Sequence, residues 1–188
     1  TLSPEEIVSY ALATRSRSIA FTYSEPVVFY EYMYDTAVLA RKKGLKNVMI
    51  SAGYINRAPL EELLQYMDMV KVDLKGFDDR FYREYIGGRL EPVKNTLLTL
   101  KKSGKLFEIV NLVVPGLNDG DDSMADMVSW IKKELGADVP LFFSRFMPNY
   151  QLAGIGVTPV ETLTRARDKA MKQGLKFVYV GNVAGHPG

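Results

Sequence analysis

The residues of this sequence that could do chemistry stand at the ends of short apolar stretches. The clearest case is Asp73-Leu74-Lys75, which places a carboxylate and an ammonium two residues apart. Because side chains alternate along a strand, both charges are expected on one side, where they could hold a zwitterion or act as acid and base. The alternative is a surface ion pair of small energetic value, and the residues alone leave the two open.

Two more charged residues occupy comparable places. Glu25 follows the stretch 18–23 and precedes Pro26, so its carboxylate could meet a ligand or simply begin a helix, where a negative charge is favourable. Arg145 lies inside the aromatic run 142–146, where a guanidinium normally needs an anionic partner. We therefore expect an anion beside Arg145.

The composition excludes several classes of protein. Cysteine is absent and histidine occurs once, so this sequence predicts no disulfide, no thiol nucleophile, no cysteine-held cluster and no metal site. The net charge of +2 gives no electrostatic argument for nucleic acid. No apolar run is long enough to cross a bilayer, and no signal peptide opens the sequence, which predicts a cytoplasmic location without membrane contact. Since the sequence begins at Thr1 without methionine, we expect it to be part of a longer protein.

The secondary-structure elements that must position these residues alternate regularly between strand and helix. Six short apolar stretches read as strands, and helical patterns separate them; the stretches are 18–23, 47–51, 69–74, 107–114, 141–146 and 177–180. Strands alternating with helices predict a single α/β domain over residues 1–188, with a parallel sheet covered on both faces. Ligands of such folds bind beyond the carboxyl ends of the strands, where the charged and amide residues gather. This chemistry suits a zwitterionic, ribose-bearing or carboxylate ligand.

Four segments in this order resemble the radical S-adenosylmethionine (radical SAM) enzymes, in particular the AmmeMemoRadiSam and pyruvate-formate-lyase-activating-enzyme-like group. They are SIAFTYSEP (18–26), VDLKGF (72–77), NLVVPGLND (111–119) and YVGNVAGH (179–186). The resemblance implies a partial (βα)6 barrel of TIM type. It also implies a [4Fe–4S] cluster on a CxxxCxxC segment, and cleavage of SAM to methionine and a 5′-deoxyadenosyl radical.

The same resemblance assigns roles to individual residues. Tyr23, Ser24 and Glu25 stand where the family contacts the amino group of SAM. Asp73 and Lys75 match a DLK motif that faces the ribose and the methionine carboxylate. Further SAM contacts are implied at the strand ends, namely Ser51, Asn111 and Val113.

Two departures from the family pattern are present. The first family strand and its cysteine loop are missing, so five of the six barrel strands and one C-terminal extra strand are expected. Tyr150 stands where activating enzymes carry a histidine that contacts SAM, and Arg145 could compensate for it.

Three functional hypotheses follow. The first is the SAM-binding portion of a glycyl-radical-activating-like enzyme, inactive without cluster cysteines, whose radical acceptor (protein or small molecule) is unknown. The second is a non-catalytic SAM- or nucleotide-binding or partner-binding domain that self-associates through an open sheet edge. The third is a cluster-free enzyme that uses Asp73 and Lys75 as acid and base.

Overall fold

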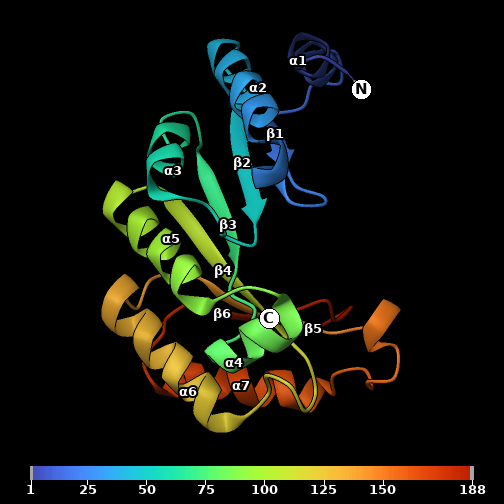
Figure 1. The fold of residues 1–188 in the computed structure, drawn as a ribbon, viewed down its shortest axis with the longest axis vertical. Helices are drawn as coiled ribbons and strands as arrows, with labels where there is room; N and C mark the ends of the chain where they lie inside the picture. The colour runs from blue at the N-terminus through green and yellow to red at the C-terminus, as the bar shows by residue number, and fades with distance from the viewer. Residues whose placement is uncertain (1, 187–188) are drawn as a thin grey trace. The chain divides into compact units, whose positions relative to one another are not determined.

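The computed structural model describes residues 2–186 and contains a strand in each of the six predicted stretches (Figure 1). They are β1 Ser18–Phe21, β2 Lys46–Ser51, β3 Met69–Asp73, β4 Leu106–Val113, β5 Leu141–Arg145 and β6 Val178–Gly181. The strands follow chain order in one sheet, and the β1–β2, β2–β3, β4–β5 and β5–β6 pairs are parallel. The predicted α/β class is therefore confirmed.

Helices connect the strands. The α-helices are α1 Pro4–Ala13, α2 Tyr30–Lys42, α3 Arg57–Leu63, α4 Asp79–Phe81, α5 Leu90–Ser103, α6 Asp121–Trp130 and α7 Val160–Lys172. Single π-turns, η2 Tyr82–Ile86 and η3 Ile131–Leu135, continue α4 and α6. The 3-10 turns are η1 Pro26–Phe29 and η4 Tyr150–Leu152.

The chain divides into two compact units. The first runs to Val72 and includes residues 95–107, and the second comprises residues 73–94 and those from 108 on. The prediction of a single domain over 1–188 stays a prediction.

In the first unit, local capping sets where α1 begins, and apolar packing holds the helix in place. The Ser3 hydroxyl accepts from the Glu6 N–H at 3.3 Å, and the Glu6 carboxylate accepts from the Ser3 N–H at 2.7 Å. This capping box satisfies two N–H groups that a helix start leaves open. Behind it, Val8 and Ala11 pack against Ala40 and Leu45.

Strand β1 departs from the expectation that every strand is covered on both faces. Ser18 and Ala20 are exposed, whereas Phe21 is buried. β1 is the first strand of the sheet order and pairs only with β2, so one of its edges carries no strand within the described residues. An open edge of this kind can accept another strand.

Asp68 joins the start of β2 to the segment before β3 within the first unit. Its carboxylate accepts from the Asn47 N–H and from the Lys46 ammonium, both at 2.9 Å. Burial opposes ionisation, but these two donors and Arg41 outweigh it and hold the pKa of Asp68 below its usual value. The carboxylate therefore stabilises the fold at neutral pH.

A pH-dependent stability follows from this lowered pKa. A depressed folded-state pKa stabilises above the unfolded value of about 3.9, and that contribution disappears as the pH falls through the folded-state pKa. We expect Asp68→Asn to lower the free energy of unfolding by about 1–2 kcal/mol at pH 7 and by much less near pH 2. Urea unfolding of both proteins at the two pH values measures this. An equal loss at both values would contradict it.

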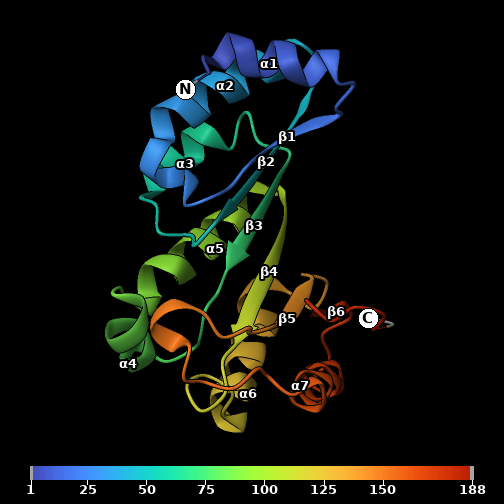
Figure 2. The same cartoon turned by 90° about the vertical axis from the view of Figure 1, so that its right-hand side faces the viewer.

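In the second unit, β4, β5 and β6 present one well-buried face. Along the part of β4 that belongs to this unit, Ile109, Asn111 and Val113 are buried, whereas Leu112 is exposed. Helices α6 and α7 of this unit pack against one another (Figure 2). Thr158, fully buried just before α7, ties the strand ends together. Its hydroxyl donates to the Val113 carbonyl at 2.6 Å and accepts from the Phe146 N–H at 3.0 Å.

Candidate functional site

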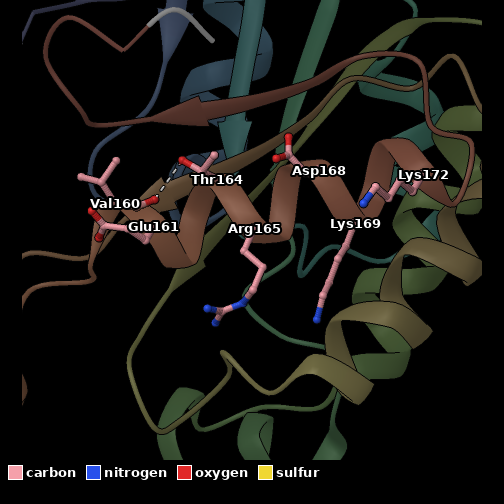
Figure 3. Close-up of a pocket in the computed structure, with 7 residues that line it drawn as sticks. All are labelled: Val160, Glu161, Thr164, Arg165, Asp168, Lys169 and Lys172. Atoms are coloured by element: carbon pink, nitrogen blue, oxygen red, sulfur yellow. Dashed lines mark hydrogen bonds between the residues drawn. The ribbon is translucent and has the colours of Figure 1, made fainter.

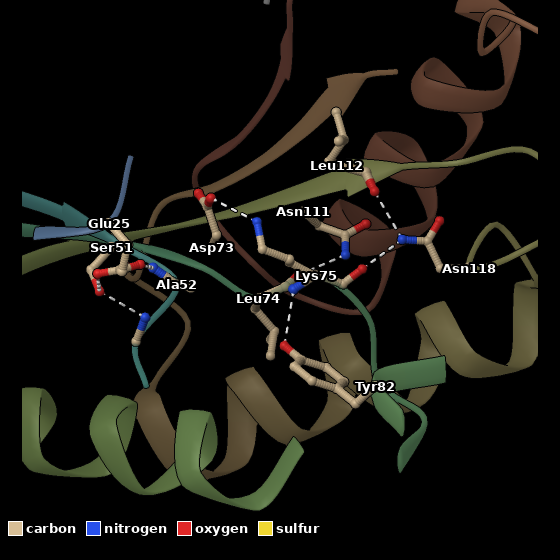
Figure 4. Close-up of polar contacts among 11 residues, drawn as sticks. Glu25, Ser51, Ala52, Asp73, Leu74, Lys75, Tyr82, Asn111, Leu112 and Asn118 are labelled. Carbon is tan, nitrogen blue, oxygen red and sulfur yellow. Dashed lines mark hydrogen bonds and ion pairs between the residues drawn. The ribbon is translucent and has the colours of Figure 1, made fainter. Parts of the chain in front are cut away.

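In the first unit, the carboxylate of Glu25 accepts hydrogen bonds from η1 and from the end of β2, and Figure 4 shows those from β2. Oε1 accepts from the Ser51 hydroxyl at 2.7 Å and from the Val27 N–H at 3.2 Å, and Oε2 accepts from the Ala52 N–H at 2.7 Å. The bond to Val27 caps η1, so the helix-starting interpretation of Glu25 is confirmed. A carboxylate offers about four acceptor positions, so Oε2 still has capacity for a further donor.

Ser51 connects Glu25 to the turn after β2. Its hydroxyl accepts from the Gly53 N–H at 3.0 Å while it donates to Glu25. The Gly53 carbonyl in turn accepts from the buried Thr96 hydroxyl at 2.7 Å. Gly53 has a φ of +73°, a conformation that glycine adopts without steric cost. This chain of hydrogen bonds fixes the position of the Glu25 carboxylate.

In the second unit, Asp73 and Lys75 form the predicted pair. The Lys75 ammonium lies 3.0 Å from Asp73 Oδ2. The Lys75 side chain is 31% exposed and the Asp73 side chain is 36% exposed. Figure 4 shows the ammonium directed at the carboxylate. An ion pair this exposed contributes little to stability, about 0–1 kcal/mol. It is nevertheless well suited to receive a ligand that carries both charges.

Buried side chains hold the backbone under this pair. The Asn111 amide donates to the Leu74 carbonyl at 2.8 Å, and the Asn118 amide donates to the Lys75 carbonyl at 2.6 Å. The Lys75 N–H donates to the Tyr82 hydroxyl at 3.1 Å. Burial raises the pKa of Tyr82 to about 12, so the phenol is neutral at pH 7. Asn111 thus acts on the backbone, and its buried Oδ1 accepts no hydrogen bond within the described residues.

Arg145 differs from its expected setting. Its Nε–H donates to the Thr158 carbonyl at 2.9 Å, and no carboxylate among the described residues forms an ion pair with it. Within the described residues a backbone carbonyl thus takes the place of a carboxylate, and an anionic ligand beside Arg145 stays a prediction. The terminal NH2 groups of the guanidinium stay available to an anion.

Other predicted site residues lie in different settings. The side chains of Tyr23 and Tyr150 are 90% and 85% exposed, and both residues have positive φ values, 21° and 48°. Ser24 is exposed, and Val113 is fully buried in the core. Neither Val113 nor Asn111 presents its side chain to solvent.

Three contributors escaped the sequence-based prediction: Asn118, Tyr82 and Thr158. Asn118 stands in the turn Pro115-Gly116-Leu117-Asn118-Asp119, and this turn pattern was the one signal that could have pointed to it. In the sequence, Tyr82 lies within a helical pattern and Thr158 opens the last one, and neither position suggests a part in the site. Their partners belong to other segments, so only the folded chain identifies them.

A groove of about 470 Å³ runs along α7 (Figure 3). Two of its charged side chains pair with α6, since Lys169 lies 2.6 Å and Arg165 3.9 Å from Asp121. The Thr164 hydroxyl in the groove donates to the Val160 carbonyl. The groove contains none of the predicted site residues.

The comparison with known families decides the class. A model of the radical SAM superfamily matches residues 1–129. The chain belongs to the radical SAM superfamily. Members of this superfamily use SAM and a [4Fe–4S] cluster.

Relatives agree with this assignment. An uncharacterized protein of Methanocaldococcus jannaschii is 46% identical over 187 residues, which are 100% of this chain and 55% of that protein. Pyruvate formate-lyase 1-activating enzyme of Escherichia coli K12 is 24% identical, over 93% of this chain and 77% of the enzyme. The chain thus spans about half the length of the M. jannaschii relative.

A solved structure shares the fold of this radical SAM chain. A domain of pyruvate-formate lyase-activating enzyme from Bacteroides vulgatus superposes with a TM-score of 0.76 at 12% identity, covering 88% of this chain and 99% of that domain. The predicted partial-barrel architecture is confirmed by this likeness.

The two cofactors of the family fit this chain differently. Within the second unit, the Asp73–Lys75 pair complements the hydroxyl and carboxylate groups of SAM. Within the first unit, Glu25 has acceptor capacity for an ammonium group. The cluster does not fit: the sequence has no cysteine, and no group of three or more potential metal-binding side chains occurs within residues 2–186. The same residues include no helix long and apolar enough to span a bilayer.

Proposed function

We propose that this chain binds SAM and forms the SAM-holding part of a radical SAM enzyme of the activating type. The observation that carries the proposal is the Asp73–Lys75 pair at the end of β3, 3.0 Å apart on a backbone held by buried side chains. An alternating carboxylate and ammonium in the family's DLK position favours SAM over a neutral ligand.

Each charged residue has a distinct role in this proposal. Glu25 receives the ammonium of SAM at Oε2, where acceptor capacity remains. Asp73 faces the ribose hydroxyls, and Lys75 faces the methionine carboxylate. Bound SAM would replace the Asp73–Lys75 contact with two contacts of its own. The other contacts to SAM that we propose from the family resemblance are Tyr23, Ser24, Ser51, Asn111, Val113, Arg145 and Tyr150.

The activity of the whole enzyme is also a proposal. Since relatives include pyruvate formate-lyase 1-activating enzyme, we propose a protein as the radical acceptor and glycyl-radical formation as the outcome. We further propose that the reaction takes place in the cytoplasm. This chain's own part is to bind and orient SAM and to keep water from it.

Calorimetric titration with SAM tests the binding proposal. We expect one SAM per chain, and a dissociation constant at least tenfold higher for Asp73→Ala and for Glu25→Gln, because each change removes a charge-assisted contact. Asp138→Ala is the matched control for Asp73→Ala, since Asp138 is exposed and forms an ion pair with Lys176 at the surface. The Asp138→Ala variant should bind SAM with the affinity of the wild type.

The alternative of a partner-binding domain rests on the open edge of β1. We propose that this edge can pair with a second copy of the chain, since edge strands present unpaired backbone groups. Light scattering of the calorimetry samples distinguishes the functions. A stable oligomer without heat from SAM would overturn SAM binding and favour the interaction role.

A further inference from the structure

The segment that follows β3 carries Lys75 and begins directly after Asp73, the last residue of that strand. β3 ends at Asp73, and Leu74, Lys75 and Gly76 are neither helix nor strand. Backbone in such a segment rotates freely unless other groups hold it. The direction of the Lys75 side chain therefore depends on what fixes the peptide between Leu74 and Lys75.

That peptide is held from both sides within the second unit. Its carbonyl, on Leu74, accepts from the Asn111 amide at 2.8 Å, and its N–H, on Lys75, donates to the Tyr82 hydroxyl at 3.1 Å (Figure 4). Two hydrogen bonds at opposite ends of one peptide plane prevent its rotation. Asn111 and Tyr82 thus set the orientation of the peptide that joins Leu74 to Lys75.

The next peptide is held as well. The Lys75 carbonyl accepts from the Asn118 amide at 2.6 Å, and Asn118 is itself fixed because its Oδ1 accepts from the Val114 N–H. Asn111, Tyr82 and Asn118 are only 1%, 2% and 7% exposed, so water does not compete for these bonds. Gly76 completes the arrangement, since a Cβ there would lie 2.7 Å from the Phe81 ring.

We propose that Tyr82, Asn111 and Asn118 are positioning residues for SAM, which act by holding the Leu74–Lys75 peptide so that Lys75 and Asp73 keep the orientation in which they meet the ligand. This inference rests on the proposed function. The exposed ion pair does not maintain that geometry alone, because both side chains are partly in solvent. The buried hydroxyl and carboxamides provide the rigidity that preorganises the site.

Tyr82→Phe is the cleanest test, because it removes one hydroxyl and keeps the buried ring. We expect the dissociation constant of SAM to rise about three- to tenfold, the range of one lost hydrogen bond. Tyr32→Phe is the matched control: it also removes a hydroxyl bonded to the backbone, at the Leu2 carbonyl, on the exposed surface of the first unit. It should leave the SAM affinity unchanged.

A double-mutant cycle separates positioning from a general structural role. If Tyr82 acts through Lys75, Tyr82→Phe should change the affinity less than twofold in a Lys75→Met background. Amide exchange of ligand-free protein gives a second readout: the Lys75 N–H should exchange faster in Tyr82→Phe than in the wild type and in Tyr32→Phe.

The outcomes are distinguishable from a failure of SAM binding itself. Wild-type protein that takes up no SAM would overturn the proposed function and this inference together. This inference alone would be overturned if the wild type binds SAM but Tyr82→Phe weakens SAM binding as much in the Lys75→Met background as in the wild type. This inference would also be overturned if Tyr82→Phe has the SAM affinity of the wild type, or if its Lys75 N–H exchanges at the wild-type rate.

Discussion

Replacing Asn118 by alanine should lower the free energy of unfolding by about 3 kcal/mol, since it leaves several buried backbone groups without partners. The Asn118 side chain, 7% exposed, makes three hydrogen bonds. Its amide donates to the Lys75 carbonyl at 2.6 Å and to the Leu112 carbonyl at 2.8 Å, and its Oδ1 accepts from the Val114 N–H at 2.6 Å. No other described side chain takes over these contacts.

The size of this loss depends on which of the three hydrogen bonds of Asn118 water can replace in Asn118→Ala. Leu112 is 38% exposed, so its carbonyl can be rehydrated in part, whereas Val114 is buried and its N–H stays unpaired. Each unmade buried hydrogen bond costs about 1–3 kcal/mol, and partial rehydration brings the sum of three toward the lower end. Urea unfolding followed by circular dichroism measures the loss.

Asn95→Ala is the matched control, since Asn95 is exposed on α5. It should change stability by less than about 0.5 kcal/mol. Asn118→Asp separates the two functions of the carboxamide: it keeps the acceptor for Val114 but turns a carboxylate toward two carbonyls, so we expect it to be as destabilising as alanine. A loss below about 1 kcal/mol in Asn118→Ala would contradict the bracing role.

Incubated with SAM and dithionite, this chain should release no 5′-deoxyadenosine above the protein-free control. Reductive cleavage of the C5′–S bond needs an electron from the family's cluster, and this sequence offers no cysteine to hold it. Among residues 2–186, no group of three or more His, Asp or Glu side chains substitutes for the thiolates. Chromatography of the quenched reaction measures the product after iron and sulfide have been supplied.

The comparison is a protein in which a CxxxCxxC segment precedes this sequence. We expect that protein to release 5′-deoxyadenosine, and Asp73→Ala within it to lower the yield. Product from the cysteine-free chain after reconstitution would show that other ligands hold a cluster, and the proposed division of roles would be wrong. A third result, turnover in air without iron that Lys75→Met abolishes, would favour the cluster-free acid–base enzyme.

Much of the fold was readable from local patterns. Stretches such as 47–51 and 141–146 are largely apolar, contain residues that favour strands and are bounded by turn residues. The strands Lys46–Ser51 and Leu141–Arg145 lie at these places. The helical patterns predicted between the strands are present as well, for example as α6 and its π-turn between β4 and β5. These predictions succeed because backbone periodicity and apolar burial act over a few neighbouring residues.

Predictions about partners were less reliable. Glu25 proved to cap η1, as its place before Pro26 allows, yet its bonds to Ser51 and Ala52 span 26 and 27 residues. Arg145 was expected beside an anion, but it pairs with the Thr158 carbonyl. A backbone carbonyl is present at every residue, so no sequence pattern marks the one that a side chain reaches.

Local patterns along the chain were enough to predict the class of fold, the number of strands, the nearness of Asp73 to Lys75 and the lack of thiolates for a cluster in this sequence. What holds that charged pair in place became known from the folded chain alone. Asn111 and Asn118 reach the backbone of Leu74 and Lys75 across 37 and 43 residues of chain. Hydrogen bonds act over about 3 Å and in one direction, so such partners are chosen by how the strands pack and not by the composition of any segment.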